Sequence, residues 1–351
     1  MKRQNWIYQI RGLAIIAVVI CHQQHLLHES EIIQLFSLYS VTTLIFLMGV
    51  TKSISLKSHF HQSDSQMSIL MYSLKAMVPT LCAYMVASFF YTYDPEIGID
   101  LNTLLASSLS FSACVPFYFV KYYILLSLWA PLLYAAIKFI LGCQLKKTKK
   151  SGLLILMYFL LWLIGYESIG RMDIFAQSYL FVYSCGLLLG EVKLEGTSLK
   201  KIYFLPAMVI LVVGLISTKR FYWARVAGVY DYSGGVDVLA PKLQMNPPNI
   251  SIVFYSFGVI GVAYLIFRFS ENNNNRFSRM IHFIFIMLGK YSLDIFLWHM
   301  YIQKFMIQYF DTLNCRILQW ILFYGAMLII PATIRYIYTI GKQKVFDLLK
   351  V

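Results

Sequence analysis

The chain has 351 residues, of which 59% are hydrophobic and only 13% are charged. A water-soluble domain of this length does not need so much apolar surface, so the composition excludes an ordinary soluble protein and predicts an integral membrane protein. The apolar runs are continuous, which predicts membrane-spanning helices and not a β-barrel with its short alternating segments. The formal net charge of +14 must be explained by topology before a nucleic-acid partner is considered.

The apolar runs predict an all-α, polytopic membrane protein with ten spans in a single domain that covers residues 1–351. Each span needs about 20 predominantly apolar residues. The predicted spans are 6–27, 32–50, 68–92, 117–142, 151–166, 175–190, 202–217, 250–268, 286–309 and 317–339. The serine-rich segment 101–114 is too short to cross, and we expect it to be re-entrant or to lie at the membrane surface.

The basic residues of the loops predict the orientation. With the N-terminus in the cytoplasm, the cytoplasmic segments carry 17 lysine and arginine residues, whereas the outer loops carry six. The positive-inside rule then places both termini in the cytoplasm of a cell (plasma or inner) membrane. Most of the positive charge is therefore explained by the membrane topology. We expect the lipid bilayer to be a partner and nucleic acid not to be one.

The first predicted span carries Arg11 and His22, which are eleven residues apart. At 3.6 residues per turn this spacing is almost three whole turns, so both side chains share one helix face, about 16 Å apart along the axis. Ionisable groups at membrane depth are costly and indicate a pathway or a reactive site. The alternative is an arginine that reaches the headgroups and a hydrogen-bonded core histidine.

The chemistry of these two side chains suits a general base and a phosphate-binding cation. A neutral imidazole near pH 7 can take the proton of a hydroxyl that attacks a carbonyl, and a guanidinium can hold a phosphate through two hydrogen bonds. His25 follows His22 by one turn, but a metal would need further ligands that the spacing does not supply. The six scattered cysteines fit neither a zinc site nor a disulfide framework. We expect no metal and no bound cofactor.

The ninth predicted span contains Ser292 and His299, seven residues apart and therefore nearly on one helix face. We expect both to line a substrate site. On another side of the same helix, Lys290 and Asp294 are four residues apart, and we expect them to neutralise each other.

Two outer segments remain open to more than one interpretation. The loop 218–249 mixes aromatic rings with carboxylates and amides, which suits a sugar ring. The alternative for this loop is an aromatic belt at the headgroups. A second outer segment carries Glu167, Arg171 and Asp173. These side chains either form a solvated cluster or contact the acceptor substrate.

Two segments resemble acyltransferase family 3, whose membrane proteins O-acylate bacterial surface glycans. IRGLAIIAVVICHQ, which contains Arg11 and His22, resembles the R-x10-H motif of the family's first helix. LGKYSLDIFLWHMYI at 288–302 resembles a late pattern, G-x-x-S-x-x-x-Y-x-x-H, with Phe296 where the family often has tyrosine. The resemblance implies that His22 is the catalytic base, that Arg11 holds donor phosphates and that His299 lines the site.

The chain departs from the family pattern at two places. The element that follows the second span reads IFLMGVTKS, with Met48 where the family usually has serine. Ahead of the third span, the family's pair of arginines before a proline is reduced to Lys75 before Pro79. The resemblance therefore leaves Lys75 as the second cation for the donor phosphates.

Together these features predict a membrane O-acyltransferase. It would move an acyl group, with acetyl as the expected one, from cytoplasmic acyl-CoA to a sugar hydroxyl of a surface or lipid-linked glycan. Acyl-CoA (acetyl-CoA) would be a donor substrate and not a bound cofactor. The alternative is a multi-pass transporter or flippase of a polar or glycan substrate, which often shows inverted repeats; we see no such repeat in the sequence.

Overall fold

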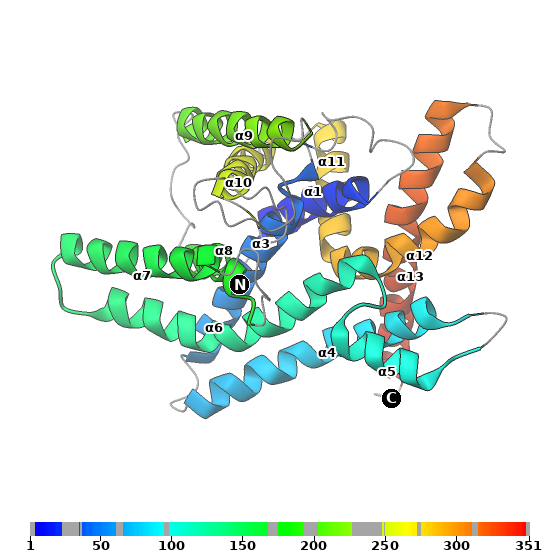
Figure 1. The fold of residues 1–351 in the computed structure, drawn as a ribbon, viewed down its shortest axis with the longest axis horizontal. Helices are drawn as coiled ribbons and strands as arrows, with labels where there is room; N and C mark the ends of the chain where they lie inside the picture. The colour runs from blue at the N-terminus through cyan, green and yellow to red at the C-terminus, as the bar shows by residue number, and fades with distance from the viewer. Residues whose placement is uncertain are drawn as a thin grey trace. The chain divides into compact units, whose positions relative to one another are not determined.

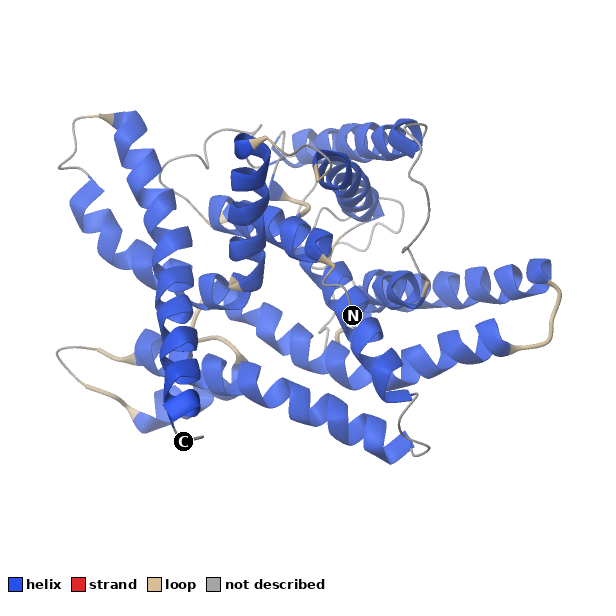
Figure 2. Ribbon diagram, turned by 180° about the vertical axis from the view of Figure 1, so that it is seen from behind, coloured by secondary structure: helices blue, strands red, loops and turns tan. Residues whose placement is uncertain are grey.

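The computed structural model describes residues 4–22, 35, 37–60, 66–94, 98–167, 175–192, 203–226, 248, 250–271, 275–310 and 315–348. These residues form helices joined by short connections, and no strand occurs among them (Figure 2). The prediction of an all-α protein is confirmed.

The elements are labelled in Figure 1. In chain order they are α1 (Asn5–Cys21), α3 (Ser40–Phe60), α4 (Gln66–Thr92), α5 (Leu101–Ser110), η1 (Val115–Phe117), α6 (Tyr118–Gly142), α7 (Lys147–Glu167), η2 (Gln177–Tyr179), α8 (Leu180–Glu191), α9 (Phe204–Val226), α10 (Ile250–Ser270), α11 (Arg276–Lys290), α12 (Ser292–Phe310) and α13 (Arg316–Leu348).

Several helices have the length and composition of membrane spans. Within the described part of the chain, five helices meet both criteria; they lie at Ser68–Thr92, Tyr118–Gly142, Lys147–Gly165, Ile250–Ser270 and Ile317–Gly341. The pair α11 and α12 makes a sixth if it counts as one broken span, because the two helices are bent by 79°. The chain is thus a membrane protein, while ten spans and cytoplasmic termini stay predictions.

The predicted ninth span, 286–309, is not one straight helix. α11 ends at Lys290, and α12 begins at Ser292 after a sharp bend. The sequence predicted a single span because apolar residues lie on both sides of the bend.

Close contacts divide the chain into two compact units, and each is assembled from separate stretches of sequence. The first unit consists of Met1–Ser40, Tyr84–Phe117 and Ala263–Val351, and the second of Val41–Ala83 and Tyr118–Val262. The single domain predicted for residues 1–351 stays a prediction.

In the first unit, α1 is the central helix. It packs along α11 and also contacts α12 and α13, while α12 packs on α13. Most of its apolar side chains are buried, and Ile10, Ala14, Ile15 and Val19 fully so. A helix that is apolar on all sides can be surrounded by other helices in this way.

Two glycines let α1 and α11 touch through their backbones. A Cβ atom at Gly12 of α1 would collide with the carbonyl oxygen of Phe285, and a Cβ at Gly289 of α11 would collide with the carbonyl oxygen of Tyr8. Small residues allow such close approach between helices in membranes, where association depends on packing. This contact fixes α1 over about one turn, from Tyr8 to Gly12.

The segment 101–114 forms the short helix α5. Asp100 caps its N-terminus by accepting hydrogen bonds from the backbone N–H groups of Asn102 and Thr103. Phe111 ends the helix in the left-handed conformation, with φ of 58°. At ten residues α5 cannot cross a membrane, as the sequence predicted, and its re-entrant or surface position stays a prediction.

In the second unit, α6, α7 and α8 pack on one another. Side chains tie these helices to neighbouring backbone groups. The indole Nε1–H of Trp129 donates to the carbonyl oxygen of Phe175 at 3.0 Å, and the hydroxyl of Tyr158 donates to the carbonyl oxygen of Ser184 at 2.9 Å. The first bond is exposed and the second is partly buried.

The substitution Gly12→Ala should lower the thermal stability of the purified protein, because the added methyl group must push α11 away. Overpacking of this kind costs about 1–3 kcal/mol. Gly325→Ala in α13 is the matched control, since its Cβ would meet only Ile329 Cδ1 at 4.0 Å. The melting temperature of the control should match or exceed that of the wild type, because alanine has a higher helix propensity than glycine. A melting temperature of Gly12→Ala at or above the wild-type value would contradict the backbone contact.

Candidate functional site

Two histidines from opposite ends of the chain meet in the first unit. His22 follows the last helical residue of α1 as its C-cap, and His299 lies at the start of the third turn of α12. Nδ1 of His22 lies 3.1 Å from Nε2 of His299, and the ring centroids are 5.1 Å apart. His299 is fully buried, whereas His22 is partly exposed. The imidazole of His299 is therefore enclosed by protein, and that of His22 is accessible.

The hydrogen bonds of His299 determine which nitrogen of each ring carries a proton. Nδ1 of His299 lies 2.8 Å from the carbonyl oxygen of Phe296 and 3.1 Å from that of Ile295. Carbonyl oxygens only accept, so this Nδ1 must carry the hydrogen. In the neutral form, which a fully buried imidazole favours, Nε2 of His299 is then an acceptor.

It follows that His22 donates through Nδ1 to His299. The neutral His22 ring then has its lone pair on Nε2, the nitrogen that is not used in the pair. A histidine that is oriented by a partner at one nitrogen and keeps the other free has the arrangement of a general base.

The other predicted residues of the first unit lie along the same two helices. α1 is continuous from Asn5 to Cys21, so the helix required by the Arg11–His22 spacing is present. The guanidinium carbon of Arg11 lies 5.9 Å from the ring centroid of Tyr8, within the range of a cation–π contact. Ser292 is the first residue of α12, about two turns before His299.

Lys75 belongs to the second unit, where it is exposed on α4. The structure thus brings His22 and His299 into contact and places Arg11 and Ser292 further along the helices that carry them. The roles assigned to all five residues stay predictions.

The predicted ion pair of Lys290 and Asp294 is wrong. Asp294 instead pairs with Arg335 of α13, with 3.7 Å between the carboxylate oxygen Oδ1 and Nε. A pair four residues apart needs a continuous helix, and the bend at Tyr291 separates these two residues. The ammonium group of Lys290 lies 5.0 Å from the ring centroid of Tyr291. Asp294 therefore links α12 to α13.

A second polar contact holds the other end of α1. Gln9 is buried, and its side-chain amide is hydrogen-bonded to Nδ1 of His282 in α11. The second ring nitrogen, Nε2, lies 2.8 Å from the hydroxyl oxygen of Ser270 in α10. These bonds fix the part of α1 that carries Arg11.

Some predictions concern residues outside the described part of the chain. They are His25, the stretch 227–247 of the outer loop, Arg171 and Asp173, and the side chain of Glu167. Among the described residues, no group of three or more His, Cys, Asp or Glu side chains is placed to hold a metal ion.

The sequence analysis missed Tyr91, whose hydroxyl contacts α12 next to His299. A single tyrosine near the end of an apolar span gives no sequence signal for such a role. The contact joins residues more than 200 positions apart, so only the fold reveals it.

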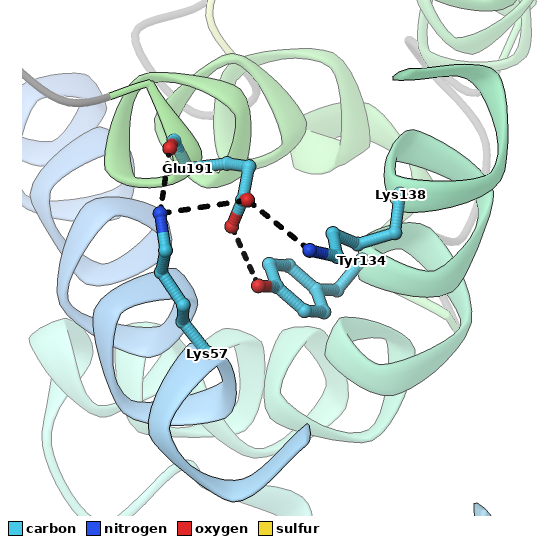
Figure 3. Close-up of polar contacts among 4 residues, drawn as sticks. All are labelled: Lys57, Tyr134, Lys138 and Glu191. Atoms are coloured by element: carbon cyan, nitrogen blue, oxygen red, sulfur yellow. Dashed lines mark hydrogen bonds and ion pairs between the residues drawn. The ribbon is translucent and has the colours of Figure 1, made fainter. Parts of the chain in front are cut away.

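The second unit contains a cluster of charged residues around Glu191, the last residue of α8 (Figure 3). The carboxylate accepts a hydrogen bond from the hydroxyl of Tyr134 at 2.6 Å and one from Nζ of Lys138 at 3.3 Å. Nζ of Lys57 lies 3.5 Å from the same carboxylate and donates to the carbonyl oxygen of Glu191 at 2.9 Å. The cluster joins α3, α6 and α8.

Glu191 lies outside the candidate membrane spans, and its surroundings favour the charged carboxylate. Burial by itself would raise the pKa of Glu191. The hydrogen bond from Tyr134 and the positive charges of Lys138 and Lys57 outweigh burial, so the pKa lies below the ordinary value of 4.5. Glu191 therefore remains ionised near neutral pH and contributes to the stability of the unit.

Comparison with known proteins identifies the class. The profile of the family described as an acyltransferase domain, acyltransferase family 3, matches residues 4–336. The match includes nearly the whole chain and both histidines of the pair, so the chain belongs to acyltransferase family 3. No curated protein and no solved structure matches the chain. The protein is a membrane acyltransferase that transfers groups other than aminoacyl groups.

Glu191→Gln should destabilise the protein at pH 7 by about 1–3 kcal/mol, because the two lysines lose the charge that they surround. The folded-state pKa of Glu191 is lowered, so its contribution to stability is present above the unfolded-state pKa and is lost as the pH falls through the folded-state value. Melting temperatures of wild type and variant should therefore differ at pH 7 and converge below about pH 4. A constant difference across this range would contradict the stabilising role of the charge.

Proposed function

We propose that this membrane acyltransferase transfers an acetyl group from cytoplasmic acetyl-CoA to a sugar hydroxyl of a surface or lipid-linked glycan. The protein would lie in the plasma or inner membrane with both termini in the cytoplasm. The donor would then approach from the cytoplasm and the glycan from the outer side. The positive-inside distribution of lysine and arginine supports this orientation.

The His22–His299 pair is the observation that carries the proposal. In an acyltransferase, the acceptor hydroxyl must lose its proton as it attacks the acyl carbonyl. His22 is partly exposed, is oriented through Nδ1 and keeps Nε2 for this proton. His299 would stabilise the imidazolium that forms by accepting from Nδ1–H.

The reaction can be written as one proton cycle. The sugar oxygen attacks the thioester carbon, and its proton moves to Nε2 of His22. The tetrahedral intermediate collapses with cleavage of the C–S bond, and the imidazolium returns the proton to the sulfur. The products are the sugar ester and free CoA thiol. Hydrogen-bond donors near the carbonyl would stabilise the developing oxyanion.

Arg11 is the proposed ligand for the donor phosphates. The helix places it about 16 Å from His22 along the axis, so a molecule held at Arg11 must extend along α1 to bring its thioester to the base. CoA, with its phosphates far from its sulfur, is such a molecule. A guanidinium can hold a phosphate through two parallel hydrogen bonds. Lys75 is the proposed second cation for the donor, and Ser292 with His299 would line the acceptor side.

The transporter alternative has no comparable support. The family match assigns the chain to acyltransferases, and a paired, oriented imidazole serves proton transfer. A transporter would require two alternating openings to the membrane surfaces.

His22→Gln should abolish transfer while the protein still inserts and binds acetyl-CoA. A positioned base contributes about 10²–10⁴-fold to the rate, and glutamine cannot take up the proton. The measurement is mass spectrometry of surface glycans from cells that make wild type or variant at equal membrane levels, with acetyl-CoA binding measured on purified protein.

His59→Gln is the matched control for the loss of a histidine. His59 lies on α3 in the second unit, with its ring against Tyr72, and the variant should acetylate normally. Normal glycan acetylation by His22→Gln would remove the catalytic assignment and return the chain to the transporter hypothesis.

A further inference from the structure

The turn of α12 that carries His299 has an unusual set of hydrogen bonds. In a regular helix, the N–H of Tyr301 donates to the carbonyl oxygen of Leu297, four residues earlier. Here that N–H donates to the hydroxyl oxygen of Tyr91 at 2.7 Å. The same hydroxyl donates to the carbonyl oxygen of Leu297 at 3.1 Å. The Tyr91 hydroxyl therefore bridges the donor and acceptor of one helical bond.

The bridge spans the helical turn in which His299 lies, midway in sequence between Leu297 and Tyr301. On the N-terminal side of this turn, the imidazole donates to the carbonyl oxygens of Ile295 and Phe296. α12 is continuous through this turn, and the Tyr91 hydroxyl adds two hydrogen bonds to its backbone. The orientation of the His299 ring thus depends on a turn whose geometry includes the Tyr91 hydroxyl.

Tyr91 is held in place by aromatic contacts within the first unit. Its ring packs edge-on against Phe117, with centroids 5.1 Å apart, and against Tyr301, with centroids 5.5 Å apart. Edge-to-face pairs at these distances are favourable. The ring is therefore anchored independently of its hydroxyl, and phenylalanine can occupy the same position.

We propose that Tyr91 is a positioning residue for the His22–His299 pair. The proposal rests on the proposed function of His22 as the base. The hydroxyl holds the 297–301 turn so that Nε2 of His299 points at Nδ1 of His22, and the acceptor at Nδ1 keeps the lone pair of His22 on Nε2. The Tyr91 hydroxyl acts on the backbone of α12, and its effect reaches the reaction through His299.

Loss of the hydroxyl should impair the chemical step and leave donor binding intact. In Tyr91→Phe the carbonyl oxygen of Leu297 and the N–H of Tyr301 lose their bonds to the hydroxyl, so the turn is held less firmly and His299 can move relative to His22. A displacement of about 1 Å can cost on the order of 10²-fold in rate even when the change lies away from the chemistry. We expect the maximal rate to fall about 10-fold or more, with the KM for acetyl-CoA unchanged.

The experiment uses membranes that contain the full-length protein and its native glycan. Radiolabelled acetyl-CoA is the probe, and the initial rate of incorporation into glycan is measured against its concentration. Tyr84→Phe is the matched control. Tyr84 lies seven residues earlier on α4, also packs on Phe117, and donates its hydroxyl to the carbonyl oxygen of Ser108 at 2.8 Å. This variant loses a comparable hydrogen bond away from α12 and should keep the wild-type rate.

A double-mutant cycle separates positioning from a general loss of structure. If Tyr91 acts through His299, Tyr91→Phe should cost little further activity in a His299→Gln background. The proposal would be overturned if Tyr91→Phe kept the wild-type maximal rate, or if Tyr84→Phe lost as much of that rate as Tyr91→Phe. It would also be overturned if Tyr91→Phe lowered the rate by the same factor with His299 present and with His299→Gln. Active His22→Gln would instead refute the proposed function, so the two failures are distinguishable.

Discussion

Neutral histidine accepts a proton through only one of its two ring nitrogens, and the partner of the other nitrogen decides which. In this protein the partner is Nε2 of His299, 3.1 Å from His22 Nδ1 although the residues lie 277 positions apart. Nε2 of His299 can accept only because the Nδ1–H of the same ring donates to two carbonyl oxygens of its own helix. The site thus begins with backbone oxygens of α12 and ends at Nε2 of His22, the C-cap residue of α1.

This arrangement requires that α1 and α12 keep a fixed relation, and the packing of the first unit provides it. α1 contacts α11 through backbone atoms at Gly12 and Gly289, and the buried Gln9 is tied to His282 at the same interface. On the other side, Asp294 connects α12 to Arg335 of α13. A buried imidazole without its partner would be costly, so the packing also protects the pair.

The sequence predicted the residues of the pair but not the reason for their contact. The eleven-residue spacing of Arg11 and His22 and the late motif around His299 were readable because helical periodicity is local and the motifs resemble a family. The bend at Tyr291 was not readable, since apolar residues on both sides of it predicted one continuous helix, and for the same reason the Asp294 partner was misassigned. The apolar run predicted that the second span ends at residue 50, yet α3 continues to Phe60. Lys57, in this last part of α3, is neutralised by the carboxylate of Glu191. Tyr91 could not be found either, because its role depends on a contact across more than 200 residues.

The proton position on His22 tests the account most directly. Nitrogen-15 NMR of histidine-labelled protein in lipid bilayers distinguishes an imidazole protonated at Nδ1 from one protonated at Nε2, and His22→Gln identifies the His22 signals. The account predicts neutral His22 with hydrogen on Nδ1 and a bare Nε2, and His299 with hydrogen on Nδ1 as well. A His22 ring protonated at Nε2 near neutral pH would contradict it, because the nitrogen assigned to receive the hydroxyl proton would already carry one.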